Sequence, residues 1–332
     1  MRIQVVGAGV CGLSCALRLR EAGHRVRIRA AATTPQTTSA VAAALWLPFA
    51  VDRWSADTAR WAHTSLAEFR ALQGVAGAGV RSQTVIGRFP AIATGDWREL
   101  VGLRPVDRSH LPATLAAAFG DGACSFDVPV IDTRHFLPWL LQHFRNLAEP
   151  DDRAIDPRPV ANLDEPFADG FELVVNCTGL GAAQVAPDAA VYAVEGQIVY
   201  QAQAGLELGV VDEVDVTEHR GARVFTYVVP RGDEVVGGGT LRPTATGGSE
   251  PAPDPELRAL ILERCHALLP QLRGAPVLGE RAGRRPLRRG GPRVALERRV
   301  AGPVVHDYGH GGCGISLALG CARDVVALVE RA

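Results

Sequence analysis

A glycine-rich turn at the start of the chain constrains the fold more than any other feature. Residues 2–6 form a short apolar run typical of a buried strand, and they lead directly into the sequence GAGVCG at 7–12. Apolar residues then recur at helical spacing until Gly23 ends the helix, and a second strand begins near Val26. This strand–turn–helix–strand order predicts a doubly wound dinucleotide-binding domain.

Each glycine of this turn has its own task in such a domain. Gly7 allows the tight turn, Gly9 lets a pyrophosphate approach the backbone, and Gly12 lets the helix pack closely on the strand. The alternative is a glycine-rich turn in some other α/β fold. The acid that usually binds the ribose of NAD at the end of the second strand is missing, because Arg29 and three alanines stand there. This counts against NAD, leaves Arg29 open for the 2′-phosphate of NADP, and leaves the adenosine end of any FAD less tightly held.

The remaining elements suggest a domain with an insertion. The expected helices are 42–72, 133–144, 256–269 and 315–329, and the expected strands are 173–179 and several antiparallel ones between 196 and 240. Nucleotide-domain elements thus occur at both ends and near the middle. We expect a discontinuous cofactor domain at 1–45, 130–185 and 270–332, and an inserted substrate domain at 46–129 and 186–269.

The composition excludes several classes of function. The chain has no lysine, so its 35 basic residues are all arginine. It therefore has no Schiff-base lysine for pyridoxal phosphate and no Walker lysine for nucleoside triphosphates. The net charge of -1 gives no bulk attraction to nucleic acid or to acidic membranes, and we find no apolar run long enough to cross a bilayer. Without a signal peptide or a peroxisomal ending, we expect a cytoplasmic protein.

The cysteines and histidines do not predict a metal site. Seven cysteines without a Cys-x-x-Cys pair indicate free, buried thiols rather than a disulfide framework. His306 and His310 stand four residues apart, but glycines surround His310 and no helix would hold both on one ion. We interpret His310 as a structural residue of a packed turn, without a catalytic role.

Five ordered segments resemble the D-amino acid oxidase family, which includes the D-aspartate oxidases. The two longest are PQTTSAVAAALW at 35–46 and VHDYGHGGCGIS at 305–316. Between them, NCTG at 176–179, YVVP at 227–230 and RPLR at 285–288 match in order and approximate spacing. The resemblance covers nearly the whole chain. It implies an α/β fold in which a discontinuous FAD-binding Rossmann-like domain carries an inserted antiparallel-sheet substrate domain.

The resemblance also implies a substrate site. Arg285 would hold the substrate carboxylate with two parallel hydrogen bonds, and Tyr227 would be the second donor. The carbonyl of Gly312 would receive the amine, so that one face of the α-carbon is turned toward the flavin. Arg223 stands where many animal members carry a tyrosine over the pocket. The alternatives are an ordinary sheet tyrosine and, for the arginines of 281–299, a solvated basic face or a nucleic-acid patch.

The expected contacts to FAD come from five parts of the chain. In the turn before the last helix, amide donors and the helix dipole would face the flavin where negative charge gathers on reduction. The full expected set is Gly7, Gly9, Val10, Gly12, Thr37, Thr38, Trp46, Val160, Gly179, Gly311, Gly314, Ile315 and Ser316.

The implied reaction is the oxidation of a D-amino acid by hydride transfer from the α-carbon to FAD, with no acid or base from the protein. The imine then hydrolyses to a 2-oxo acid and ammonia, and oxygen reoxidises the flavin to give hydrogen peroxide. Leu241 replaces an arginine of the D-aspartate oxidases, which favours neutral substrates, whereas Arg220 and Arg223 leave D-aspartate and D-glutamate open.

Three rival functions stay open from the sequence. They are an NAD(P)-dependent dehydrogenase, a flavin-binding module without catalysis, and an amine oxidase acting on glycine or N-methyl amino acids. The expected partners are a D-amino acid and O2, without nucleic acid or membrane. The sequence leaves a homodimer open.

Overall fold

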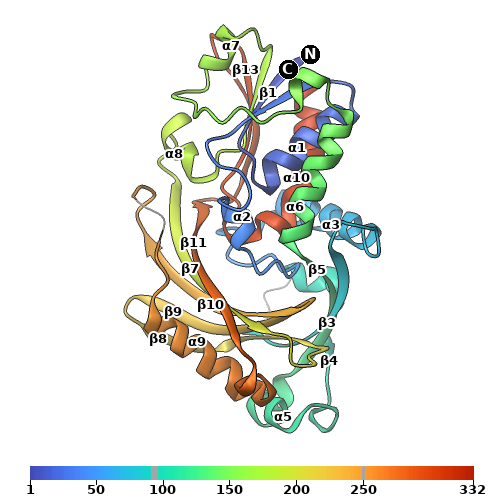
Figure 1. The fold of residues 1–332 in the computed structure, drawn as a ribbon, viewed down its shortest axis with the longest axis vertical. Coiled ribbons are helices and arrows are strands. Elements are labelled where there is room, and N and C mark those ends of the chain that lie inside the picture. The colour runs from blue at the N-terminus through green and yellow to red at the C-terminus, as the bar shows by residue number, and fades with distance from the viewer. Residues whose placement is uncertain (91–95, 249–250) are drawn as a thin grey trace.

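The computed structural model describes residues 1–90, 96–248 and 251–332 as two sheets with helices packed around them (Figure 1). The strand order is β12-β13-β6-β1-β2 in the smaller sheet and β11-β7-β10-β9-β8-β3-β5-β4 in the larger one. In Figure 1 the smaller sheet and the helices α1, α6 and α10 form the upper part of the molecule, and the larger sheet forms the lower part. The predicted α/β class is confirmed.

The smaller sheet is built from segments that are far apart in the sequence. β1 (Arg2–Val6) pairs in parallel with β2 (Arg25–Arg29) and with β6 (Leu173–Asn176). β6 continues in parallel to β13 (Pro303–Tyr308), and β12 (Arg293–Arg298) closes the edge as an antiparallel strand. β1 and β6 are buried almost throughout, which is why these strands read as continuous apolar runs.

Four longer helices pack together beside this sheet. α1 (Val10–Glu21) contacts α6 (Thr133–Leu147) and α10 (Gly314–Val329), and α10 also contacts α3 (Ala56–Ala71). By length and composition alone, Gly311–Val329 is sufficient to cross a bilayer, contrary to the expectation from the sequence, but 61% of its most apolar window is buried inside the protein. Its apolar residues are therefore accounted for by the contacts of α10 with α1 and α3.

The larger sheet is antiparallel except for the parallel pair β3–β8. α9 (Pro255–Leu268) packs against β7, β9 and β10 and buries Leu257, Ile261 and Cys265. Short helices occupy the connections. The strand bounds are β3 (Val80–Arg88), β4 (Arg104–Pro105), β5 (Cys124–Ile131), β7 (Val191–Ala202), β8 (Gly209–His219), β9 (Ala222–Arg231), β10 (Glu234–Thr244) and β11 (Val277–Arg288). The short helices are α2 (Thr38–Val41), α4 (Trp97–Val101), α5 (Ala113–Phe119), α7 (Glu165–Ala168) and α8 (Ala182–Val185).

Two expectations from the sequence need correction. Only 56–71 of the expected helix 42–72 is helical, because Pro48 interrupts the segment and Ala44 and Ala50 take positive φ angles of 56° and 52°. The expected cofactor domain included 277–288, but this segment is β11 and pairs with β7 in the larger sheet. Its backbone pairing joins two distant segments, which the local pattern cannot predict.

Candidate functional site

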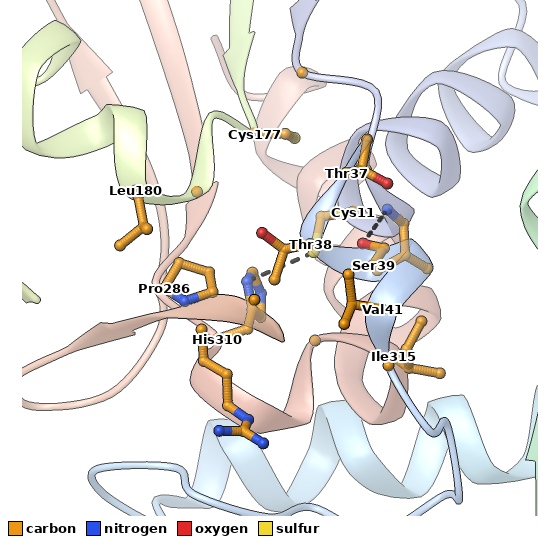
Figure 2. Close-up of a pocket in the computed structure, with 18 of the residues that line it drawn as sticks. Cys11, Thr37, Thr38, Ser39, Val41, Cys177, Leu180, Pro286, His310 and Ile315 are labelled. Carbon is orange, nitrogen blue, oxygen red and sulfur yellow. Dashed lines mark hydrogen bonds between the residues drawn. The ribbon is translucent and has the colours of Figure 1, made fainter. Parts of the chain in front are cut away.

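A cavity of about 590 Å³ lies at the carboxyl ends of the parallel strands β1, β2, β6 and β13 and extends to β9 and β11. In doubly wound sheets this end of the strands is where ligands bind. Residues from distant segments surround the cavity (Figure 2): Cys11, Thr37, Thr38 and Ser39 from the first forty residues, and His310 and Ile315 from the last thirty.

The glycine turn after β1 has the geometry that its sequence predicts. Gly7 has a φ of +117°, and a Cβ atom there would lie 2.3 Å from the carbonyl oxygen of Cys177. A Cβ atom on Gly12 would lie 2.0 Å from the carbonyl oxygen of Gly7, so Gly12 acts by close packing and does not line the cavity. Gly7 and Gly9 do line it, at the amino-terminal end of α1.

Hydroxyl groups around this turn suit a phosphate ligand. Ser39 Oγ accepts a hydrogen bond of 3.0 Å from the amide of Val10, which leaves the hydroxyl proton of Ser39 available to a ligand (Figure 2). Thr37 Oγ1 is buried and makes no hydrogen bond within the described part of the protein, although Thr37 lines the cavity. A buried hydroxyl without a partner is uncommon and indicates a missing ligand atom. The residues present therefore fit the pyrophosphate of a dinucleotide.

A second turn brings the amino terminus of α10 to the same cavity. Gly311, Gly312, Gly314, Ile315 and Ser316 all line it. A Cβ atom on Gly311 would lie 2.4 Å from the carbonyl oxygen of Ala50, so only glycine fits at this close approach. The positive end of the α10 dipole thus faces the cavity, as expected for a site that stabilises negative charge. Val160 and Gly179, also expected cofactor contacts, line the cavity as well.

Arg285 and Tyr227 meet in the cavity by lying across glycines of neighbouring strands. Arg285 on β11 extends over Gly196 of β7, where a Cβ atom would come within 2.2 Å of Arg285 Nη1. Nη1 donates to the carbonyl oxygen of Thr240 on β10 at 2.9 Å. From β9, the Tyr227 hydroxyl extends over Gly238 of β10, where a Cβ atom would lie 2.4 Å from the hydroxyl oxygen. Two glycines therefore make room for both side chains.

The electrostatics of this pair favour an anionic ligand. Burial lowers the pKa of Arg285, partly offset by Tyr227, and no carboxylate within the described residues forms an ion pair with Arg285. Burial raises the pKa of Tyr227 to about 12, so the phenol is neutral and can donate a hydrogen bond. A cation held within the protein without a counter-ion is costly, and a ligand carboxylate would compensate for it.

Besides Gly12, three residues expected at the site do not line the cavity or act there as predicted. Arg223 lies on the same face of β9 as Tyr227 but beyond the cavity, with a side chain that is 63% exposed and paired with Glu218. Trp46 is fully buried in the core. Arg29 lines the cavity, but it donates to Glu165 and to the carbonyl oxygens of Arg158 and Pro159. These bonds use Nε and Nη2 of the guanidinium, and the Glu165 carboxylate neutralises the charge that a 2′-phosphate would need.

The two histidines near the carboxyl end have different partners. His306 Nε2 lies 2.8 Å from Glu297, and its Nδ1 is bonded to Asn176. His310 lines the cavity, with Nδ1 3.5 Å from Cys11 Sγ and Nε2 3.0 Å from Asp307. Although burial lowers the pKa of His310, Cys11 and Asp307 raise it well above its usual value.

Sequence reasoning missed several residues of the cavity. Phe225 could have been found, because it alternates with Tyr227 along β9 and so lies on the same face. Phe49, whose ring is 4.9 Å from that of Phe225, also lines the cavity, and the resemblance does indicate this position, because Phe49 replaces a tyrosine of the family there. The roles of Gly196 and Gly238 depend on strand pairing and leave no local signal.

Comparisons with known proteins agree with this geometry. The model of the family described as FAD dependent oxidoreductase matches residues 2–328. The chain is 38% identical to a D-amino-acid oxidase of Rubrobacter xylanophilus, over 100% of this chain and 96% of that protein. It is 36% identical to a D-amino-acid oxidase of Streptomyces coelicolor (99% and 96% covered) and 32% identical to a human D-aspartate oxidase (99% and 95% covered).

Solved structures share the fold at low sequence identity. A glycine oxidase from Geobacillus kaustophilus superposes with a TM-score of 0.77 at 20% identity, covering 99% of this chain and 95% of that one. An L-amino acid deaminase from Proteus vulgaris gives a TM-score of 0.74 at 12% identity, covering 99% and 93%. At these identities the likeness establishes the arrangement of the two sheets and no more.

Proposed function

The chain belongs to the family of FAD-dependent oxidoreductases, and we propose that it catalyses the oxidative deamination of D-amino acids with O2 as acceptor. Two bacterial relatives that match over nearly their full length are D-amino-acid oxidases. The products would be a 2-oxo acid, ammonia and hydrogen peroxide. The missing acid at the end of β2 and the occupied guanidinium of Arg29 make an NAD(P)-dependent enzyme the weaker candidate.

The observation that carries this proposal is the pairing of Arg285 with Tyr227. One guanidinium without an acidic partner and one neutral phenol converge in a cavity that also contains the two glycine-rich turns. A planar guanidinium can hold a carboxylate through parallel hydrogen bonds, which fixes its direction. The pair therefore suits an amino acid held by its carboxylate.

The side chains of the site position the substrate and do not transfer protons. The clamp of Arg285 and Tyr227 would hold the carboxylate, and the carbonyl of Gly312, on a separate turn, would receive the amine. Two fixed anchors orient the α-carbon, so that only one enantiomer presents its hydrogen to the cofactor. When bound, FAD supplies the acceptor for that hydride. The neutral Tyr227 phenol is a poor base at neutral pH, which agrees with a role in positioning the substrate and not in proton transfer.

We further propose that neutral D-amino acids are the preferred substrates. The cavity wall around the clamp is apolar, with Leu47, Phe49, Val211 and Phe225. Arg220 and Arg223, the candidates for an acidic side chain, pair at exposed positions with Glu256 and Glu218. A substrate carboxylate in this wall would lose hydration without gaining a cationic partner.

A peroxide-coupled assay with matched amino acids tests both proposals. We expect D-alanine, D-methionine and D-valine to give higher kcat/KM than D-aspartate and D-glutamate, and their L-enantiomers to give no peroxide. Faster turnover of the acidic substrates would overturn the proposed preference for neutral D-amino acids but not the proposed oxidase activity. Absence of peroxide with every D-amino acid would overturn the proposal that the protein is a D-amino acid oxidase.

A further inference from the structure

The segment 47–52, which we call the strap, contacts both proposed anchors of the substrate. Phe49 lines the cavity, and its ring centroid is 5.8 Å from the guanidinium carbon of Arg285. On the other side, the amide of Gly312 donates a hydrogen bond of 3.4 Å to the carbonyl oxygen of Ala50. A Cβ atom on Gly312 would lie 2.6 Å from the carbonyl oxygen of Phe49. The strap therefore lies against both the carboxylate clamp and the turn that offers the amine acceptor.

The strap is an irregular segment, so contacts outside it must hold its conformation. Ala50 has a φ of 52°, which is uncommon for a residue with a Cβ atom and persists only where the surroundings impose it. Just before the strap, Leu45 pairs with Val130 of β5 through an isolated bridge. This bridge holds the amino-terminal side, and the carboxyl end needs a fastening of its own.

Asp52 fastens the carboxyl end of the strap. Its Oδ1 accepts a hydrogen bond of 3.1 Å from the hydroxyl of Tyr192, at the start of β7. Its Oδ2 accepts one of 2.7 Å from the amide of Gly290, in the turn between β11 and β12. Both partners are donors, which suits a carboxylate with two acceptor oxygens. One side chain thus joins the strap to β7 and to the end of β11, the strand that carries Arg285.

We propose that Asp52 is a positioning residue for the oxidation of D-amino acids, because its two hydrogen bonds hold the Gly312 carbonyl at a fixed distance from the carboxylate clamp. This inference rests on the proposed function, since only a substrate with a carboxylate and an amine uses both anchors. Arg285 is also held independently, by the carbonyl oxygens of Thr240 at 2.9 Å and Glu195 at 3.3 Å. Release of the strap should therefore displace the Gly312 turn more than the clamp.

A comparison of D-alanine with propionate tests this role on the FAD-loaded enzyme. Propionate is D-alanine without its amine, so it uses the clamp alone and serves as a competitive inhibitor. We expect Asp52→Ala to raise the KM for D-alanine about tenfold, the loss of one hydrogen bond to a charged group, and to change the Ki of propionate less than about twofold. A merely structural role would lower Tm or FAD content without separating the two ligands. Equal changes for D-alanine and propionate would overturn the proposal.

Further variants trace the effect to the two hydrogen bonds. Asp52→Asn keeps the size of the side chain but has one acceptor oxygen for two donors, so its KM for D-alanine should be intermediate. Tyr192→Phe should also raise KM, but it should add nothing in the Asp52→Ala background, where the shared bond is already lost. Full additivity of these two changes would contradict the assignment.

Asp57→Ala is the matched control, because Asp57 is an exposed carboxylate on α3 that pairs with Arg60. Its KM for D-alanine should equal that of the wild type, and a tenfold increase there would contradict a specific role of Asp52. The wild type separates this proposal from the proposed function. Absence of peroxide from every neutral D-amino acid would overturn both, whereas an active wild type that Asp52→Ala matches with both ligands would overturn only the role of Asp52.

Discussion

The guanidinium of Arg285 lies among backbone carbonyls and one phenol, with the Phe49 ring centroid 5.8 Å away. These neighbours direct its free hydrogen-bond donors but do not neutralise its charge. Removing the guanidinium should therefore affect the substrate, which supplies the anion, much more than the cofactor. Loss of this guanidinium should therefore weaken the binding of the substrate carboxylate.

We expect Arg285→Ala to raise the KM for D-alanine by about thirtyfold or more, because losing one partner of a buried charge pair costs about 2–5 kcal/mol. The FAD content should stay that of the wild type. Steady-state kinetics and the flavin spectrum measure the two effects. Arg223→Ala is the matched control and should leave KM unchanged, because that side chain is exposed. An unchanged KM in Arg285→Ala would remove Arg285 from the substrate site.

At the scale of elements, the spacing of β7 and β11 determines where Arg285 lies. Gly196→Ala would place a methyl group 2.2 Å from the present position of Arg285 Nη1. We expect the displaced guanidinium to raise KM about tenfold, in line with overpacking costs of about 1–3 kcal/mol, while FAD binding persists. Gly274→Ala, at a position with no atom within 4 Å, is the control. Equal kinetics for the two variants would show that this contact does not position Arg285.

A second element-scale prediction concerns β13, where His306 is buried between Asn176 and Glu297. Burial lowers the pKa of His306 to about 4, below the value near 6.5 of an unfolded histidine. Between these values the unfolded chain binds the extra proton, so stability present above pH 6.5 is lost as the pH falls. We expect His306→Gln to show a smaller decrease in Tm between pH 7 and pH 5 than the wild type. An equal decrease would assign the acid sensitivity to other groups.

At the scale of the whole molecule, features carried by short contiguous segments could be predicted from the sequence. The family, the α/β fold, FAD and the positions of Arg285 and Tyr227 follow from the glycine turn and five other ordered segments. Features created by pairing distant segments could not. The contact of Cys11 with His310 joins residues 299 positions apart, and the assignment of β11 to the larger sheet depends on its pairing with β7. Arg223 was expected over the pocket because many animal members of the family carry a tyrosine at this position, but its exposed side chain pairs with Glu218 beyond the cavity.

We propose that two fixed anchors in one cavity, the Arg285–Tyr227 pair and the carbonyl of Gly312, select the enantiomer whose hydrogen reaches the cofactor. Anaerobic mixing of the FAD-loaded enzyme with D-alanine or L-alanine, followed by flavin absorption, tests it most directly. We expect rapid bleaching with D-alanine and no bleaching with L-alanine over the same time. Equal bleaching with both enantiomers, or none with D-alanine or any other neutral D-amino acid, would contradict it.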